Sequence, residues 1–307
     1  MAGFPADDGA DELRRFLFEA QPQRGHWVRL VDSWQAAHAH QGLPANVRAL
    51  LGEALAAVAL LSAALKFQGT LTLQIQGGGV LPLLVAQATH DRSLRGMARL
   101  RDGVAVDPEA GLPGLAGEGQ LVVSLETGGA TPAWQGIVAL DQPTLAACLQ
   151  RYFENSEQLP TRLELAADGH QACGLLLQKL PLPASAGEVA AGQAQDLWDE
   201  SCLLLGTLRR EELLADGPRR LLGKLFAEHD VRLFDAEPVR FRCRCDRPRV
   251  AGLLRALGEA EVRDVLAEQG AVSVTCEFCQ QPWRFDAIDV EQLFRPGVEP
   301  SAGGALN

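Results

Sequence analysis

Four of the seven cysteines in this 307-residue chain stand in two close pairs near its C-terminal end. Cys243 and Cys245 form a C-x-C motif, and Cys276 and Cys279 form a C-x-x-C motif further along the chain. Two close pairs of thiolates joined by a helical spacer are the ligand pattern of a closed tetrahedral zinc site. The pattern therefore predicts one Zn²⁺ per chain in the reduced state, bound by these four cysteines.

The same thiolates have the spacing of a redox switch. Ligand sulfurs around a tetrahedral zinc lie roughly 3.8 Å apart, and a disulfide needs about 2.05 Å. Once an oxidant converts one thiolate to a sulfenic acid, a neighbouring thiol can displace it, form a disulfide and end metal binding. A segment of roughly 60 residues has a core worth about 3–5 kcal/mol, whereas a structural zinc contributes about 10–16 kcal/mol. Loss of zinc is expected to unfold this segment, and a purely structural zinc site is the alternative interpretation.

Five arginines surround the first cysteine pair: Arg240, Arg242, Arg244, Arg247 and Arg249. Their positive field favours thiolate over thiol, or they form a solvated basic face. They also raise the alternative of a zinc-ribbon nucleic-acid-binding protein. The chain as a whole carries a net charge of -11, and phosphate backbones bind basic surfaces, so binding to nucleic acid is not expected.

A thiol oxidoreductase is a further alternative, because a C-x-x-C motif can carry out disulfide exchange. A redox motif of this kind stands beside a βαβ pattern, whereas Cys276 and Cys279 stand between two predicted strands. We therefore expect no enzymatic activity. The other cysteines, Cys148, Cys173 and Cys202, fall in apolar helical or strand patterns, and we expect them to be buried structural thiols.

Hydrophobic periodicity predicts an α+β fold with four parts. Strand patterns separated by turns, with a helix over residues 144–157, predict a mixed α/β core domain over residues 1–180. Residues 181–230 begin with a proline- and glycine-containing stretch and continue as charged amphipathic helices, which indicates a helical linker. Residues 231–294 form the small C-terminal zinc domain, and residues 295–307 read as a disordered tail.

The most apolar segment, Ala54 to Leu65, is too short for a span of roughly 20 residues and is expected to be a core helix. The N-terminal sequence is acidic and lacks the basic and apolar regions of a signal peptide. These features predict no membrane association and a cytoplasmic location.

The sequence resembles the 33 kDa chaperonin family, which are redox-regulated heat-shock holdases, over nearly its whole length. The segments that carry this resemblance are "CRC", "CEFC", "YFENSEQLPT" (Tyr152 to Thr161), "CGLLLQKLP" (Cys173 to Pro181), "LKFQGTLTLQIQGGG" (Leu65 to Gly79) and "RGHWVRL" (Arg24 to Leu30). The resemblance implies an α+β core, a helical linker and a C-terminal zinc domain. It also implies zinc ligation by the four cysteines, with disulfides between Cys243 and Cys245 and between Cys276 and Cys279.

What this resemblance implies about function is a chaperone that works without ATP. The reduced, zinc-bound form is inactive. Oxidation links the cysteines, releases zinc and unfolds the C-terminal part, and the protein then binds unfolding client proteins and prevents their aggregation. The resemblance further implies a homodimer in the active state and hand-over of clients to ATP-dependent foldase chaperones.

Overall fold

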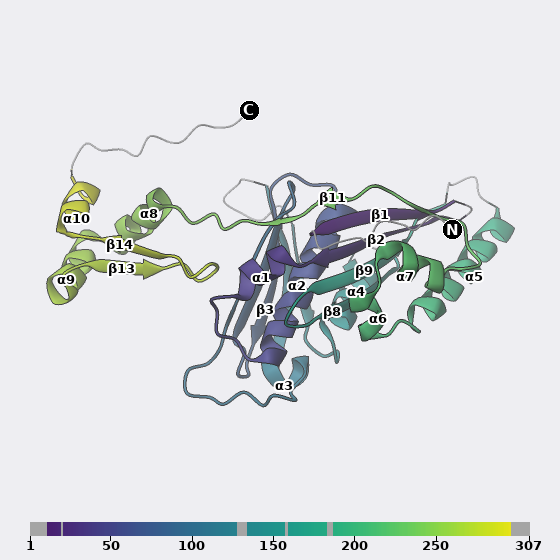
Figure 1. Cartoon of the computed structure of the whole chain (residues 1–307), viewed down its shortest axis with the longest axis horizontal. Coiled ribbons are helices and arrows are strands. Elements are labelled where there is room, and N and C mark those ends of the chain that lie inside the picture. Colours follow the sequence, from purple (N-terminus) through teal and green to yellow (C-terminus); the bar gives the residue numbers. More distant parts are fainter. Residues whose placement is uncertain (1–10, 20, 128–133, 157–158, 183–186, 296–307) are drawn as a thin grey trace. The chain divides into compact units, whose positions relative to one another are not determined.

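The computed structural model describes residues 11–19, 21–127, 134–156, 159–182 and 187–295 (Figure 1). It divides the chain into two compact units, of which the first ends at Arg242 and the second begins at Cys243. The expected disordered tail beyond Arg295, and residues 183–186 at the start of the expected linker, lie outside the described residues.

Two β-sheets form the framework of the first unit. The first sheet has the spatial order β10 (Val231–Leu233), β1 (Glu12–Phe18), β2 (Gln23–Leu30), β9 (Ala172–Lys179) and β8 (Thr161–Ala167), and β11 (Glu237–Pro238) also pairs with β1. The second sheet has the order β12 (Arg240–Phe241), β5 (Ser93–Arg99), β4 (Leu83–Thr89), β3 (Thr70–Gly77), β6 (Gly119–Glu126) and β7 (Trp134–Ala139). The pairing of β12 with β5 is parallel, and the other pairings are antiparallel.

Helix α2 (Ala45–Ala64) packs against strands of both sheets. Its side chains are buried around most of its circumference, which is why the sequence shows an almost continuous apolar run. Small residues permit this close packing, since a Cβ atom added at Gly52 would lie 2.5 Å from the Cβ atom of Ala167. The helix is long and apolar enough to cross a membrane, but 72% of its most apolar window is buried inside the protein. The expectation of a core helix is confirmed.

Three further helices belong to this part of the first unit. They are α1 (Asp32–His38), α3 (Leu112–Ala116) and α4 (Leu145–Ser156). Helix α4 contacts β7 and β8, and it places Tyr152 against Gly136. Sheets, α2 and these helices enclose one large core, which confirms the predicted α+β class.

The first sheet has a second apolar face, and the predicted linker helices cover it. These helices are α5 (Glu188–Leu205), α6 (Arg210–Ala215) and α7 (Pro218–Leu225). Successive residues of a strand point to opposite faces, so Val28 of β2 joins the core around α2 and Trp27 joins the core beneath the linker helices. Trp198, Leu222 and Phe226 fill this second core from the helical side.

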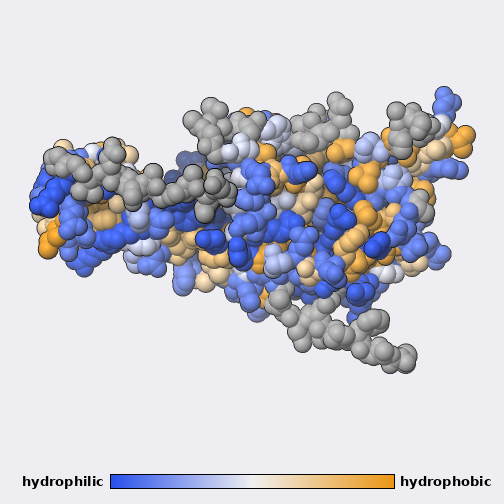
Figure 2. All heavy atoms as spheres, turned by 90° about the horizontal axis from the view of Figure 1, so that it is seen from above, coloured by the Kyte–Doolittle hydropathy of each residue, from blue (hydrophilic) through white to orange (hydrophobic). Residues whose placement is uncertain are grey.

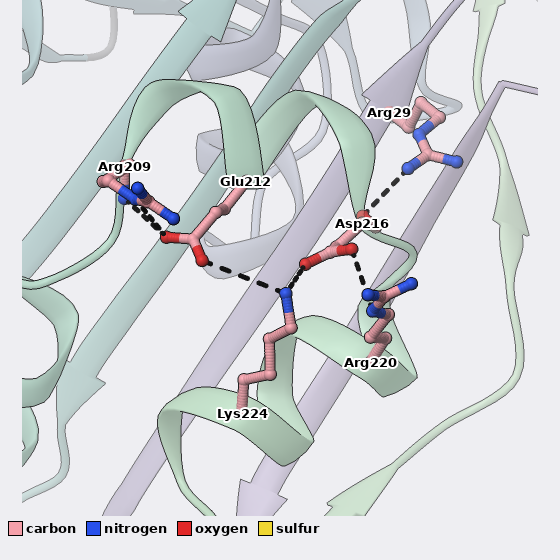
Figure 3. Close-up of polar contacts among 6 residues, drawn as sticks. All are labelled: Arg29, Arg209, Glu212, Asp216, Arg220 and Lys224. Carbon is pink, nitrogen blue, oxygen red and sulfur yellow. Dashed lines mark hydrogen bonds and ion pairs between the residues drawn. The ribbon is translucent and has the colours of Figure 1, made fainter.

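A cluster of charged residues fixes the corner between α6 and α7 (Figure 3). The carboxylate of Asp216, which follows α6 and is 7% exposed, pairs with Arg220 at 3.1 Å and with Lys224 at 2.5 Å. Arg29 of β2 donates to the backbone carbonyl oxygen of Asp216 at 2.9 Å. Lys224 also approaches Glu212 at 3.9 Å. Because these contacts join α6, α7 and β2, they hold the linker helices to each other and to the sheet.

Residues 231–242 are expected from sequence to open the C-terminal domain, yet in the structure they pair with strands of the first unit. Strands β10 and β11 extend the edge of β1, and β12 extends the edge of β5. The physical reason is that exposed edges of both sheets offer backbone partners, and Val239 is buried in the large core. The compact second unit therefore begins at Cys243, the first residue of the cysteine motifs.

The second unit contains a two-stranded sheet and three helices. Its elements are α8 (Arg247–Leu257), α9 (Glu259–Gln269), β13 (Val272–Thr275), β14 (Pro282–Phe285) and α10 (Ala287–Leu293). The helical stretch expected after the first cysteine pair is split at Gly258, whose φ of 109° lies in a region that glycine favours. The unit has a small core, made of Val250, Leu254, Val262, Val272, Phe285, Val290 and Leu293.

Candidate metal centre

The cysteines of the second unit stand at the ends of its regular elements. Cys245 directly precedes Asp246, whose side chain caps α8 by accepting from the backbone N–H of Arg249 at 2.8 Å. Cys276 and Cys279 lie in the turn between β13 and β14, where the N–H of Gln280 donates to the carbonyl oxygen of Cys276 at 2.8 Å. A capped helix start and a tight hairpin turn therefore set the directions of these side chains.

The four sulfur atoms converge on one point of the second unit. The Sγ atoms of Cys243 and Cys276 lie 3.6 Å apart, and those of Cys245 and Cys279 lie 3.3 Å apart. All four lie within 4.8 Å of one another, and each side chain is half-buried. Sulfurs around a tetrahedral zinc are spaced by roughly 3.8 Å, so the donor set and its spacing fit one zinc ion in a closed site.

The local environment shifts the pKa values of two of these thiols in opposite directions. Desolvation raises the pKa of Cys276, but backbone N–H groups of Cys279 and Phe278 that donate to its sulfur outweigh this, so its pKa lies below the ordinary value. Desolvation raises the pKa of Cys279, and the neighbouring thiols of Cys245 and Cys243 raise it further. Four thiolates without a cation would repel one another strongly, which is the electrostatic reason that such a cluster favours a divalent metal.

The arginines near the first cysteine pair make contacts within the chain. Arg247 pairs with Asp289 at 2.6 Å and donates to the carbonyl oxygen of Arg284 at 3.0 Å. Its guanidinium also lies 4.5 Å from the centre of the Phe285 ring. These contacts make Arg247 part of the fold of the second unit.

Two other arginines of this set are engaged in the same way. Arg249 donates to the carbonyl oxygen of Arg244 at 2.8 Å. Arg240, in the first unit, pairs with Asp91 at 3.0 Å. Because these groups stabilise the chain itself, the structure gives no support to the nucleic-acid alternative.

The three remaining cysteines belong to the first unit. Cys148 and Cys173 are fully buried, as predicted, and Cys202 is half-buried against the core beneath the linker helices. Burial raises the pKa of each of these thiols, and that of Cys173 reaches about 11. High pKa values keep them protonated and poorly nucleophilic, in agreement with a structural role.

Two features of the first unit do not follow from the sequence patterns. The ion pairs around Asp216 were not anticipated, although the run "ADGPRR" contains the glycine and proline of a helix junction. The pairing of residues 231–242 with both sheets was also missed, because the alternation of Val231, Leu233, Val239 and Phe241 is broken by Pro238 and an acidic stretch.

The fold and the site define an α+β protein whose small C-terminal unit carries a cluster of four cysteines that could hold a metal ion. The chain belongs to the Hsp33 family, because the family model described as Hsp33 protein matches residues 11–286. Two relatives named 33 kDa chaperonin agree with this. The protein from Nitrosococcus oceani is 47% identical over 94% of this chain and 96% of its own length. The protein from Methylobacillus flagellatus is 41% identical over 93% and 94% of the two chains.

A solved structure has the same fold. The crystal structure of the 33 kDa chaperonin (heat shock protein 33 homolog) from Thermotoga maritima aligns with a TM-score of 0.78 and covers 92% of this chain and 97% of its own. The two sequences are 23% identical, so this comparison concerns the fold alone.

Proposed function

We propose that this protein is a redox-regulated holdase that is inactive when reduced and zinc-bound and that binds unfolding proteins after oxidation. The observation that carries the proposal is the convergence of four cysteine sulfurs within 4.8 Å, in a unit with a small core of its own. Membership of a chaperonin family supports the binding of unfolded proteins. The proposal includes no enzymatic reaction.

The four cysteines are the proposed ligands of one zinc ion, which when bound would offset part of the negative charge of the thiolates and cross-link two parts of the second unit. The cross-link joins the start of α8 to the β13–β14 turn. A core as small as that of the second unit contributes only a few kcal/mol. Its folded state is therefore expected to depend on the metal centre.

Oxidation is proposed to proceed through the cysteines themselves. A peroxide oxidises one thiolate to a sulfenic acid and is reduced to water, and a second thiol then attacks that sulfur and releases another water. Formation of each disulfide takes two electrons from a pair of cysteines, and the metal loses two thiolate ligands. Two such bonds, proposed between Cys243 and Cys245 and between Cys276 and Cys279, leave the metal without its ligands.

The linker helices cover the proposed client surface, which is the apolar face of the first sheet. Loss of the metal centre is proposed to unfold the second unit and then α5, α6 and α7. Undocking of these helices would uncover the apolar face of the first sheet, including Phe16 and Trp27. In the folded state these side chains are buried, and the face shown in Figure 2 carries hydrophobic residues in small groups among hydrophilic ones. Exposed apolar patches of this kind bind unfolding chains.

Further parts of the proposal follow from the family resemblance. They are a homodimer in the active state and hand-over of clients to ATP-dependent foldase chaperones. A cytoplasmic location, expected from the acidic N-terminal sequence, is also part of the proposal. A single experiment tests the central claim. The reduced protein is treated with peroxide at raised temperature while zinc release, far-UV circular dichroism and suppression of the aggregation of a denatured client are followed together.

The expected result is that all three signals change together and are reversed by a thiol reductant with added zinc. A variant with all four cysteines replaced by serine separates oxidation from loss of the metal, because it should be partly unfolded and insensitive to peroxide. Client protection that is equal before and after oxidation would refute the switch.

A further inference from the structure

Residues 231–242, which we call the edge clasp, pair with one edge of each of the two sheets of the first unit. The clasp pairs antiparallel with β1 through β10 and β11 and parallel with β5 through β12. On the β1 side, the N–H of Phe234 donates to the carbonyl oxygen of Arg15 at 2.9 Å. The clasp is therefore an extended segment seated on sheet edges that would otherwise offer unpaired backbone groups.

On the β5 side, the clasp uses its own backbone donors. The N–H of Arg240 donates to the carbonyl oxygen of Arg92 at 3.2 Å, and that of Arg242 donates to the carbonyl oxygen of Leu94 at 2.8 Å. The alternation of a strand turns the N–H groups of Val239 and Phe241 away from β5. Two donors two residues apart thus hold the clasp to this edge.

The next backbone groups along β5 are hydrogen-bonded to a side chain. The amide nitrogen of Gln41 donates to the carbonyl oxygen of Gly96 at 2.9 Å, and its oxygen accepts from the N–H of Ala98 at 3.1 Å. Gln41 thus occupies the positions that another strand would occupy. Along this edge, the clasp or any segment that replaces it can therefore hydrogen-bond only to the backbone groups near Arg92 and Leu94.

Apolar side chains of the clasp recur at alternate positions. Val231 and Leu233 pack against the core beneath the linker helices, and Val239 and Phe241 pack against the large core. Most other side chains of the clasp are exposed. We call the strand edges of β1 and β5 and the core surfaces that hold the clasp its seat. The seat therefore fits an extended chain with apolar residues at alternate positions, and because backbone hydrogen bonds hold the chain, the other residues can vary.

We propose that the seat of the edge clasp is a docking site for an extended segment of an unfolding client with apolar residues at alternate positions. This inference rests on the proposed function. The clasp ends at Arg242, directly before the first cysteine of the metal centre, so unfolding of the second unit frees its C-terminal end. The argument for this occupant is that the segment now seated there has the same chemistry, and segments of this kind become exposed when other proteins unfold.

The test uses the full-length protein and a labelled peptide of residues 229–242, which contains no cysteine. Fluorescence anisotropy measures its binding to the reduced and to the oxidised protein. Two methylated peptides are compared, one N-methylated at Arg240 and Arg242 and a matched control N-methylated at Val239 and Phe241. Both keep every side chain, but only the first loses the donors to β5. Hydrogen exchange of the Arg240 and Arg242 amides in the protein reports release of the clasp.

We expect faster exchange of these two amides after oxidation, and at least tenfold tighter binding of the peptide to the oxidised than to the reduced protein. Methylation at Arg240 and Arg242 should weaken binding at least tenfold, which corresponds to about 1.4 kcal/mol, and the control should change it less than threefold. The unmethylated peptide should also compete with a denatured client.

Equal weakening by both methylations, or equal binding to reduced and oxidised protein, would overturn the docking site. Weaker peptide binding at higher protein concentration, together with dissociation of dimers by the peptide, would assign the seat to a second copy of this chain instead. An oxidised protein that protects a client but does not bind the peptide would refute this inference alone. An oxidised protein that protects no client would refute the proposed function as well.

Discussion

The Sγ atoms of Cys243 and Cys276 lie 3.6 Å apart, although the two residues belong to different cysteine motifs. The sulfurs of Cys245 and Cys279 approach each other across the motifs in the same way, at 3.3 Å. Folding of the second unit therefore brings together sulfurs of residues that are 33 or 34 positions apart in the sequence. This arrangement suits a cross-linking metal, which joins the two motifs into one structure.

The first prediction concerns the metal. Replacement of one sulfur ligand, as in Cys243→Ser, should greatly lower zinc content, because a hydroxyl is a poor substitute for a thiolate. Metal analysis of purified reduced protein should find about one zinc per chain in the unsubstituted protein. Cys202→Ser is the matched control and should keep full occupancy. Full occupancy in Cys243→Ser would show that this cysteine is no ligand.

The second prediction concerns the disulfides. In a folded cluster the cross-motif pairs are close, but in an unfolded segment a bond between residues 33 or 34 apart closes a larger loop than one between neighbours. Loop-closure entropy favours the neighbouring pairs by about 2 kcal/mol. Mass spectrometry after slow oxidation should therefore find Cys243 linked to Cys245, and Cys276 linked to Cys279. Predominant cross-motif bonds would mean that oxidation is complete before the unit unfolds.

The third prediction concerns the order of unfolding. The second unit has the small core, and the linker helices depend on contacts with the first sheet, whereas the sheets and α2 enclose a large core. Limited proteolysis of the oxidised protein should first cut beyond about residue 190 and leave the rest of the first unit resistant. The reduced protein, digested in parallel, should resist at the same sites. First cleavage between β3 and β6 would contradict this order.

The fourth prediction concerns the corner between α6 and α7. Asp216→Asn removes the buried charge that pairs with Arg220 and Lys224, so Arg220 loses this partner and Lys224 keeps the more distant Glu212 at 3.9 Å. We expect a loss of about 1–2 kcal/mol of linker stability. Differential scanning calorimetry and the oxidant dose needed for client protection should both report this loss.

A substitution at an exposed ion pair is the control for this experiment. Arg151→Gln breaks an exposed pair with Asp141 and should change stability by less than about 0.5 kcal/mol. If Asp216→Asn behaved like this control, the ion pairs at the corner would have no role in holding the linker.

The fifth prediction concerns pH and rests on two groups of the first sheet with opposite behaviour. Burial, together with the charges of Arg24, Arg15 and Arg92, lowers the pKa of His26 to about 3. Between pH 3 and 6.5 the unfolded chain binds a proton here that the folded chain does not. The contribution of His26 to the free energy of unfolding is therefore fully present above pH 6.5 and decreases as the pH falls. At pH 5 the free energy of unfolding is lower by about 2 kcal/mol.

The other group is Glu164, whose pKa burial raises to about 7, against the lowering effect of Arg162. Here the folded chain keeps a proton that the unfolded chain loses above pH 4.5. Stability from this group is present at low pH and is lost as pH rises to 7, by about 2 kcal/mol after screening by solvent. Between pH 4.5 and 6.5 the two contributions oppose each other.

Urea unfolding of the reduced protein at several pH values separates these contributions. In His26→Gln the slope of stability against pH should become more negative than in the unsubstituted protein, and in Glu164→Gln it should become more positive. Identical slopes in all three proteins would show that neither group changes its protonation on folding in this range.

Local patterns in the sequence predicted the α+β class and the apolar core helix, which the structure confirms, and they predicted four cysteines as metal ligands, which stays a prediction. Each depends on a local pattern: Ala45–Ala64 is apolar on nearly every face, the strands alternate, and two cysteine motifs flank a helical spacer. Hydrophobic periodicity and ligand spacing are properties of neighbouring residues, so they can be read without coordinates.

Only the tertiary structure decided where the clasp lies, how the linker is held and how the two cysteine motifs come together. Arg240 and Phe241 pair with β5 because a distant strand presents an unpaired edge, and Asp216 meets Lys224 because two short helices turn at one corner. Backbone hydrogen bonds between strands carry almost no sequence signature, and ion pairs depend on side chains that folding brings together. These relationships therefore follow from the three-dimensional arrangement of the chain, which local patterns do not specify.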